Sequence, residues 1–133
     1  MFTWKPAYSV NIPRIDAQHQ NLLAIGQELL DSMSSGQGQA ATGEKLDRLI
    51  QYTTTHFAEE EHLLQSNGYP DFEAHKLEHE ALVAKVLQFQ ADFKAGRVTI
   101  SIELVRFLRN WLIGHIQGSD QKYSPFILEK SAA

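Results

Sequence analysis

The sequence predicts an all-α protein, an antiparallel up-down-up-down four-helix bundle with an irregular N-terminal arm. Four segments place apolar side chains at alternating spacings of three and four residues, which is the inward-facing pattern of a helix in a bundle. The connections between these segments are short, and short connections make consecutive helices antiparallel neighbours. No segment alternates apolar and polar residues for long enough to predict a strand.

The arm comes first, as residues 1–15, because Pro6 and Pro13 disfavour a continuous helix there. Each apolar segment begins near a residue that can cap a helix N-terminus. These expected caps are Asp16, Thr42, Asp71 and Ser101. Pro125 limits how far the fourth helix continues, so residues 118–133 are expected to form a C-terminal tail. The chain is expected to form one domain, residues 1–133, with helices over residues 16–35, 42–66, 71–95 and 101–117.

The composition argues against several classes of function. The formal net charge is −4, which does not suggest nucleic-acid binding, because that function would call for a basic face. No apolar stretch reaches the roughly 18 residues of a membrane-spanning helix, and the N-terminus lacks the basic and apolar regions of a signal peptide. The chain has no cysteine, so any bound metal must be held by nitrogen and oxygen atoms. We therefore expect a cytoplasmic monomer without membrane insertion or nucleic-acid binding.

Histidine is the unusual feature of the composition. The chain has six histidines, and five of them fall on the inward seams of the predicted helices: His19, His56, His75, His79 and His115. One such histidine is usually a satisfied core residue. Five buried imidazoles with few carboxylates cannot satisfy one another, and protonating them would place several charges in a dry core. A metal ion bound by neutral imidazoles removes both problems. His62, Glu59 and Glu61 lie off the seam and are expected to face solvent.

The predicted positions of these residues along the bundle also agree. Two pairs are spaced by one helical turn and share a face, namely His56 with Glu60 and His75 with His79. The two pairs lie at similar distances from the turn between the second and third helices. The other two histidines lie near the start of the first helix and the end of the fourth. Antiparallel packing brings all these positions to one layer near one end of the bundle.

Asp120 does not fit the helical period. It follows His115 by five residues, which on a regular helix would rotate it about 140° away from the histidine. Periodicity alone therefore makes Asp120 an exposed acid. Gly118 lies between the two, so the helix can end, bend or bulge there.

Taken together, these residues resemble the pattern of the bacterial hemerythrins. The matching segments are Ile15-Asp16-Ala17-Gln18-His19, His56-Phe57-Ala58-Glu59-Glu60, His75-Lys76-Leu77-Glu78-His79 and His115-Ile116-Gln117-Gly118-Ser119-Asp120. The shorter matches are Trp4, Gly68-Tyr69-Pro70 and Trp111-Leu112. The resemblance covers nearly the whole chain, and no metal-binding position of the family pattern is missing.

The resemblance implies a cofactor of two non-haem iron ions joined by an oxo or hydroxo bridge. One iron would be bound by His75, His79 and His115. The other would be bound by His19 and His56, and Glu60 and Asp120 would bridge both. The two-histidine iron would keep an open position for dioxygen. The implied function is reversible dioxygen binding for oxygen transport, storage or supply to an oxygen-consuming recipient protein, and not catalysis.

Two other functions stay open. One is an oxygen- or redox-sensing module. A fused signalling domain would favour sensing, and 133 residues leave no room for such a domain. The other is a di-iron enzyme, such as a peroxidase, an oxidase or a nitric oxide-handling protein. Ferritin-like di-iron sites use about four carboxylates and two histidines, whereas this set has two carboxylates and five histidines. Zinc or copper would also suit such ligands, so iron is implied by the resemblance.

Overall fold

The computed structural model describes residues 1–132, and every regular element within this range is helical. Its α-helices are α1 (Pro13–Ser34), α2 (Gln39–Ser66), α3 (Phe72–Lys94), α4 (Ile102–His115) and α5 (Gln121–Ala132). A short 3-10 helix, Pro6–Tyr8, lies in the N-terminal arm, and a π-helical turn, Ile116–Asp120, joins α4 to α5. The predicted all-α bundle is confirmed.

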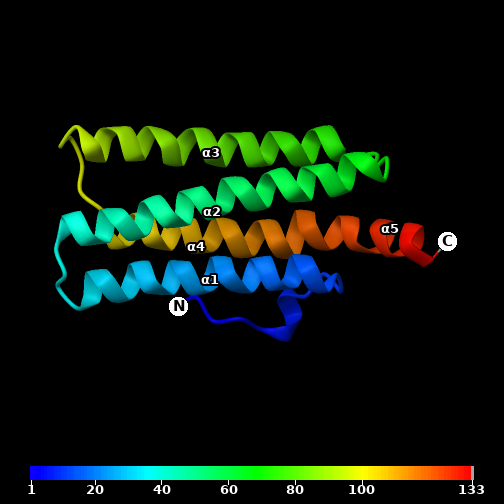
Figure 1. The fold of residues 1–133 in the computed structure, drawn as a ribbon, viewed down its shortest axis with the longest axis horizontal. Coiled ribbons are helices and arrows are strands. Elements are labelled where there is room, and N and C mark those ends of the chain that lie inside the picture. Colours follow the sequence, from blue (N-terminus) through cyan, green and yellow to red (C-terminus); the bar gives the residue numbers. More distant parts are fainter. Residues whose placement is uncertain (133) are drawn as a thin grey trace.

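Helices α1 to α4 lie side by side with alternating chain direction, and α5 continues along the line of α4 (Figure 1). The turn between α2 and α3, the start of α1 and the end of α4 lie toward the same end of the bundle, on the right of the view. The N-terminal arm runs beside α1 before it enters that helix. No helix among the described residues combines the length and the apolar character needed to cross a membrane.

Local chemistry explains where the helices end. Gly36, Gly68 and Gly96 follow α1, α2 and α3 with positive φ angles, which glycine adopts without the steric cost of a Cβ. Ser101 caps α4 by accepting a hydrogen bond from the backbone N–H of Leu104 over 3.3 Å. Asp16, which we expected to cap the first helix, instead accepts hydrogen bonds from Ser9 and from the backbone of Val10. It therefore fastens the arm to α1.

The C-terminal segment differs from the sequence prediction. Residues 118–133 were expected to form a tail, but residues 118–132 continue the fourth helix through the π-helical turn into α5. Tyr123 and Ile127 on α5 are buried against Leu64, near the C-terminal end of α2, and Tyr69, in the turn that follows α2. This packing stabilises the helix despite Pro125, since a proline in a helix interior loses a backbone hydrogen bond and clashes with the preceding turn, at a cost of about 3 kcal/mol. Helices α1 and α2 also begin three residues earlier than expected.

Two apolar clusters enclose a polar layer. The larger cluster fills most of the bundle and includes Phe57 of α2 and Ile116 of the π-helical turn. The smaller cluster lies at the end of the bundle and includes Leu64 and Tyr123. Along α2, Glu60 comes between Phe57 and Leu64, so its buried carboxylate lies between the two clusters. The fold thus places charged groups where water is excluded.

Candidate metal centre

The structure brings all seven predicted metal-binding residues together in one buried layer. They come from every helix of the bundle, with His19 on α1, His56 and Glu60 on α2, His75 and His79 on α3, His115 on α4 and Asp120 on the π-helical turn. None of these residues is more than 7% exposed. Such burial of seven polar side chains requires partners for their charges and lone pairs.

The π-helical turn places Asp120 on the same side as His115. A π-helical turn closes i to i+5 hydrogen bonds, one residue more than an α-helical turn. A spacing of five residues therefore returns to the same face, and Oδ1 of Asp120 lies 3.1 Å from Nε2 of His115. The expectation of an exposed acid, which came from periodicity alone, is wrong because the helix is not regular here.

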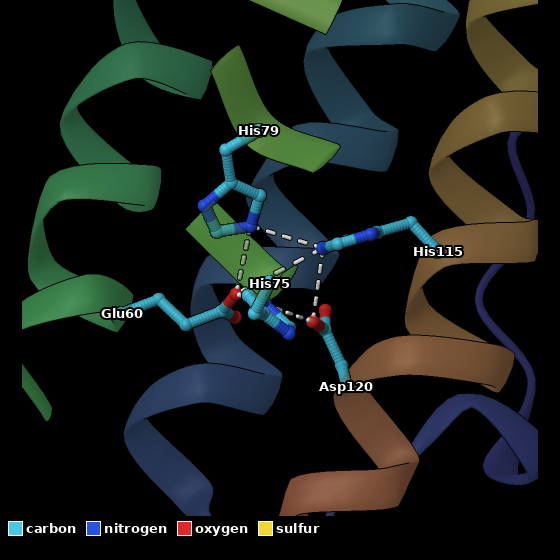
Figure 2. A group of neighbouring side chains, drawn as sticks. All are labelled: Glu60, His75, His79, His115 and Asp120. Atoms are coloured by element: carbon cyan, nitrogen blue, oxygen red, sulfur yellow. Dashed lines mark hydrogen bonds and ion pairs between the residues drawn. The ribbon is translucent and has the colours of Figure 1, made fainter. Parts of the chain in front are cut away.

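One group of donors consists of His75, His79 and His115 with Glu60 and Asp120, and we call it the three-histidine group (Figure 2). Nε2 of His79 lies 3.0 Å from Nε2 of His115 and 3.0 Å from Oε1 of Glu60. Nε2 of His75 lies 2.6 Å from the same glutamate oxygen and 3.1 Å from Oδ1 of Asp120. These five donor atoms, from α2, α3, α4 and the π-helical turn, all lie within 4.8 Å of one another.

The second group consists of His19 and His56 with the same two carboxylates, and we call it the two-histidine group. Nε2 of His19 lies 3.1 Å from Oδ2 of Asp120 and 3.8 Å from Oε2 of Glu60. Nε2 of His56 lies 3.3 Å from Oε2 of Glu60. This group therefore offers four donor atoms from the protein, one fewer than the three-histidine group.

Glu60 and Asp120 divide their oxygens between the two groups. Oε1 of Glu60 and Oδ1 of Asp120 face the three-histidine group, whereas Oε2 and Oδ2 face the two-histidine group. A carboxylate arranged in this way can bind one cation through each oxygen. The two groups are therefore adjacent and share both of their anionic donors.

The spacing of the donors fits metal ions. Bonds of about 2.1 Å to an octahedral ion place neighbouring donors about 3.0 Å apart and opposite donors about 4.2 Å apart. Contacts in the three-histidine group span 2.6 to 3.1 Å, except that Nε2 of His115 and Oε1 of Glu60 lie 3.9 Å apart. Among the described residues, both oxygens of Asp120 and both ring nitrogens of His19 are buried without a hydrogen-bond partner. Cations would satisfy three of these four atoms.

The electrostatics of the layer also favour bound cations. Burial lowers the pKa of His115, but the close carboxylates of Asp120 and Glu60 outweigh burial and raise that pKa to about 10. The same balance raises the pKa of His19 and His75 to about 9. Burial and the charge of Glu60 raise the pKa of Asp120, but the imidazoles of His115, His19 and His75 outweigh them and lower it to about 2. The ionised carboxylates therefore require positive charge beside them.

Several side chains contact the centre that the sequence pattern did not predict. The hydroxyl of Tyr123 donates to Oε2 of Glu60, and Glu61, expected to face solvent, reaches Nδ1 of His79. Glu78 contacts Nδ1 of His115, and Gln18 contacts Nδ1 of His56. Gln18 and Glu78 lie inside the segments that resemble hemerythrins, and Glu61 directly follows one of them. The helical period alone does not distinguish these three residues from surface residues. His62 contacts Ser66 at the surface and is not part of the layer.

Aromatic rings cover the three-histidine group. The ring of Phe57 stacks on His79 with centroids 3.7 Å apart, and Trp111 stacks on His115 with centroids 4.6 Å apart. Leu22, Leu112 and Ile116 are buried in the adjoining apolar cluster. The charged centre is therefore bordered by apolar and aromatic groups.

The fold and the site define a class of protein, a helical bundle whose core holds a layer of histidines and shared carboxylates suited to two metal ions. Comparison with known families agrees, because the model of the hemerythrin HHE cation-binding domain matches residues 10–127. The chain belongs to the hemerythrin family.

Individual relatives cover nearly the whole chain. Bacteriohemerythrin from Methylococcus capsulatus is 36% identical, over 94% of this chain and 95% of its own length. Bacteriohemerythrin from Stenotrophomonas maltophilia is 38% identical, over 93% of this chain and 80% of its own. A crystal structure of wild-type hemerythrin matches with a TM-score of 0.89 at 37% identity, covering 92% of this chain and 95% of that one.

Proposed function

We propose that this protein binds dioxygen reversibly at a di-iron centre and serves as a carrier, store or supplier of oxygen. The observation that supports this most strongly is the division of Glu60 and Asp120 between two unequal groups of histidines. Two shared carboxylates suit a pair of metal ions, and membership of the hemerythrin family makes those ions iron. We further propose that all seven residues of the layer are the metal ligands.

The unequal groups give the two positions different roles. The three-histidine group supplies five donor atoms and the two-histidine group supplies four, so a six-coordinate ion has more room for an external ligand in the second group. When bound, ferrous ions supply the electrons through which dioxygen is held. We therefore assign dioxygen to the side of His19 and His56.

The residues around the centre keep water out. Leu22, Leu112 and Ile116 are at most 4% exposed, and Phe57 closes the layer above His79. An enclosed, apolar surrounding strengthens electrostatic interactions within the site and restricts proton exchange with solvent. These residues therefore favour release of the ligand as intact dioxygen over its irreversible reduction.

Oxygen binding is better supported than catalysis or sensing. The relatives are hemerythrins over nearly the full length of this chain. The site also has two carboxylates rather than the four or so of ferritin-like oxygen-activating centres. A monomeric state, a cytoplasmic location and an oxygen-consuming recipient protein remain predictions from the sequence. Analytical ultracentrifugation tests the first of these.

Anaerobic titration of the metal-free protein with ferrous iron tests the proposed centre. We expect uptake to stop at two ions per chain, and Mössbauer spectra of ⁵⁷Fe-loaded protein should resolve two different iron environments, as the unequal donor sets require. Uptake of one ion per chain, or of none, would contradict the proposal.

A further inference from the structure

The five histidines of the layer all present the same ring nitrogen to the carboxylates. Their contacts with Glu60 and Asp120 are made through Nε2. A neutral imidazole that binds a cation through Nε2 carries its proton on Nδ1, so Nδ1 becomes a hydrogen-bond donor. The acceptor opposite each Nδ1 is therefore a second feature by which the two groups can differ.

In the three-histidine group, two of the acceptors are carboxylates. Nδ1 of His79 lies 2.9 Å from Oε2 of Glu61, and Nδ1 of His115 lies 2.8 Å from Oε2 of Glu78. Each carboxylate comes from the preceding helix, since Glu61 is on α2 and Glu78 is on α3. The hydroxyl of Ser119 donates to the same oxygen of Glu78 and helps to hold it in place.

In the two-histidine group, no carboxylate among the described residues contacts an Nδ1 atom. Nδ1 of His56 lies 2.6 Å from the neutral amide oxygen of Gln18. The amide nitrogen of Gln18 donates to Glu59, which also binds Arg14 over 3.1 Å. The carboxylate of Glu59 therefore contacts Gln18 and not the imidazole of His56. Nδ1 of His19 is buried without a partner.

A carboxylate that accepts a hydrogen bond from Nδ1 raises the basicity of the imidazole and fixes the orientation of its ring. A neutral amide fixes the ring but adds no negative charge. We infer that Glu61 and Glu78 act through His79 and His115 to make the three-histidine group the tighter of two divalent-cation positions, so that it fills first. This inference rests on the proposed function, because it takes the two groups as the metal positions.

The filling order has a functional consequence. The three-histidine group also has one more donor atom, and the charges of Glu61 and Glu78 add to that advantage. The ion that binds last and most weakly is then the one assigned to dioxygen. Glu61 and Glu78 are positioning residues, and they separate an anchoring cation from a ligand-binding one.

Cobalt(II) is a suitable probe, because its visible absorption reports its coordination and chelator competition gives each dissociation constant. Metal-free wild-type protein should bind two ions in two resolved steps. Glu61→Gln and Glu78→Gln keep an oxygen acceptor for Nδ1 but remove the negative charge. Each should weaken the tighter step about 10–100-fold, the range found for outer partners of metal ligands, and change the other step much less.

Glu80→Gln is the matched control. It removes the same charge from α3, one residue after His79, and its side chain is about as exposed as that of Glu78, but Glu80 pairs with Lys76 rather than with a histidine. Both cobalt affinities should match the wild type. Glu78→Ala, which removes the acceptor altogether, separates charge from orientation. Loss of affinity in Glu78→Ala with full affinity in Glu78→Gln would overturn the role of charge.

A charge swap tests the same inference from the opposite side. Gln18→Glu combined with Glu59→Gln gives His56 a carboxylate partner without changing the net charge, and it should tighten the weaker step. Two bound cobalt ions with unchanged affinities in Glu61→Gln, Glu78→Gln and the swap would overturn the inference while the proposed centre stands. Fewer than two ions in the wild type would overturn both.

Discussion

Tyr123 donates a hydrogen bond from its hydroxyl to Oε2 of Glu60 over 3.0 Å, and both side chains are fully buried. Oε2 is the oxygen that faces His19 and His56, so this hydrogen bond lies on the side that we assign to dioxygen. Burial and the charges of Glu60 and Asp120 raise the pKa of Tyr123 well above its ordinary value, so the hydroxyl keeps its proton and remains a donor. Tyr123 therefore helps to hold Glu60 in the orientation that turns one oxygen toward each group of histidines.

Tyr123→Phe should destabilise the protein without unfolding it. The phenyl ring keeps the packing against Leu64 and Tyr69, but Oε2 of Glu60 loses a buried donor. Loss of a hydrogen bond to a buried charged group costs about 1–3 kcal/mol. Urea denaturation of the metal-free protein should show this decrease in the free energy of unfolding.

Tyr52→Phe is the control for that measurement. The Tyr52 hydroxyl accepts a hydrogen bond from Asn21 at the surface, where water can replace it. Its removal should change the free energy of unfolding by less than about 0.5 kcal/mol. Equal effects of the two substitutions on the free energy of unfolding would show that the Tyr123–Glu60 hydrogen bond stabilises the protein no more than a surface hydrogen bond does.

His79→Ala should abolish the dinuclear centre. His79 contributes Nε2 to the three-histidine group and stacks on Phe57, so its removal takes away a donor and opens the covered side of the layer. Iron analysis after anaerobic loading should fall below two ions per chain. His62→Ala should keep two, because His62 lies at the surface outside the layer. The same iron content in both variants would argue against His79 as a ligand.

The stability of the metal-free protein should depend on pH through the buried histidines. Folding raises the pKa of His19 and His75 to about 9 and that of His115 to about 10, from an ordinary value of 6.5. Groups with a raised pKa stabilise the fold fully below the unfolded value, and this contribution is lost as pH rises through the folded value. Urea midpoints measured with a chelator present should therefore fall between about pH 6.5 and 10.

Bound metal should remove much of that dependence. A cation takes the place of the protons on Nε2, so the metal-loaded protein has fewer titrating imidazoles in this range. Its urea midpoints should change less between neutral and alkaline pH than those of the metal-free protein. A metal-free protein whose stability is constant across this range would contradict the electrostatic description of the layer.

The regular part of the centre could be predicted from the sequence because it follows the helical period. His56 and Glu60 lie one turn apart, and so do His75 and His79, so the inward seam alone places them in the core. Asp120 could not be placed in this way. Its position depends on a π-helical turn, and periodicity assumes a regular helix. The family pattern supplied what the period could not.

The carboxylates that contact the Nδ1 atoms of the histidines could not be predicted from the sequence for a different reason. Glu61 and Glu78 lie beside the seam, where most acidic residues face solvent, and their roles depend on which neighbouring helix each side chain meets. Helix α5 was missed because Pro125 opposes a helix locally, whereas burial of Tyr123 and Ile127 stabilises it through long-range packing. Both are effects of tertiary structure.

Repeated oxygenation of the anaerobically loaded ferrous protein, followed by visible absorption, examines the proposed function itself. Exposure to oxygen should produce a visible absorption band that disappears under vacuum and returns with oxygen over several cycles. No external reductant should be needed, because the enclosed centre between the two apolar clusters releases intact dioxygen. A band that never forms, or a ferric spectrum that persists under vacuum after the first exposure, would contradict reversible oxygen binding.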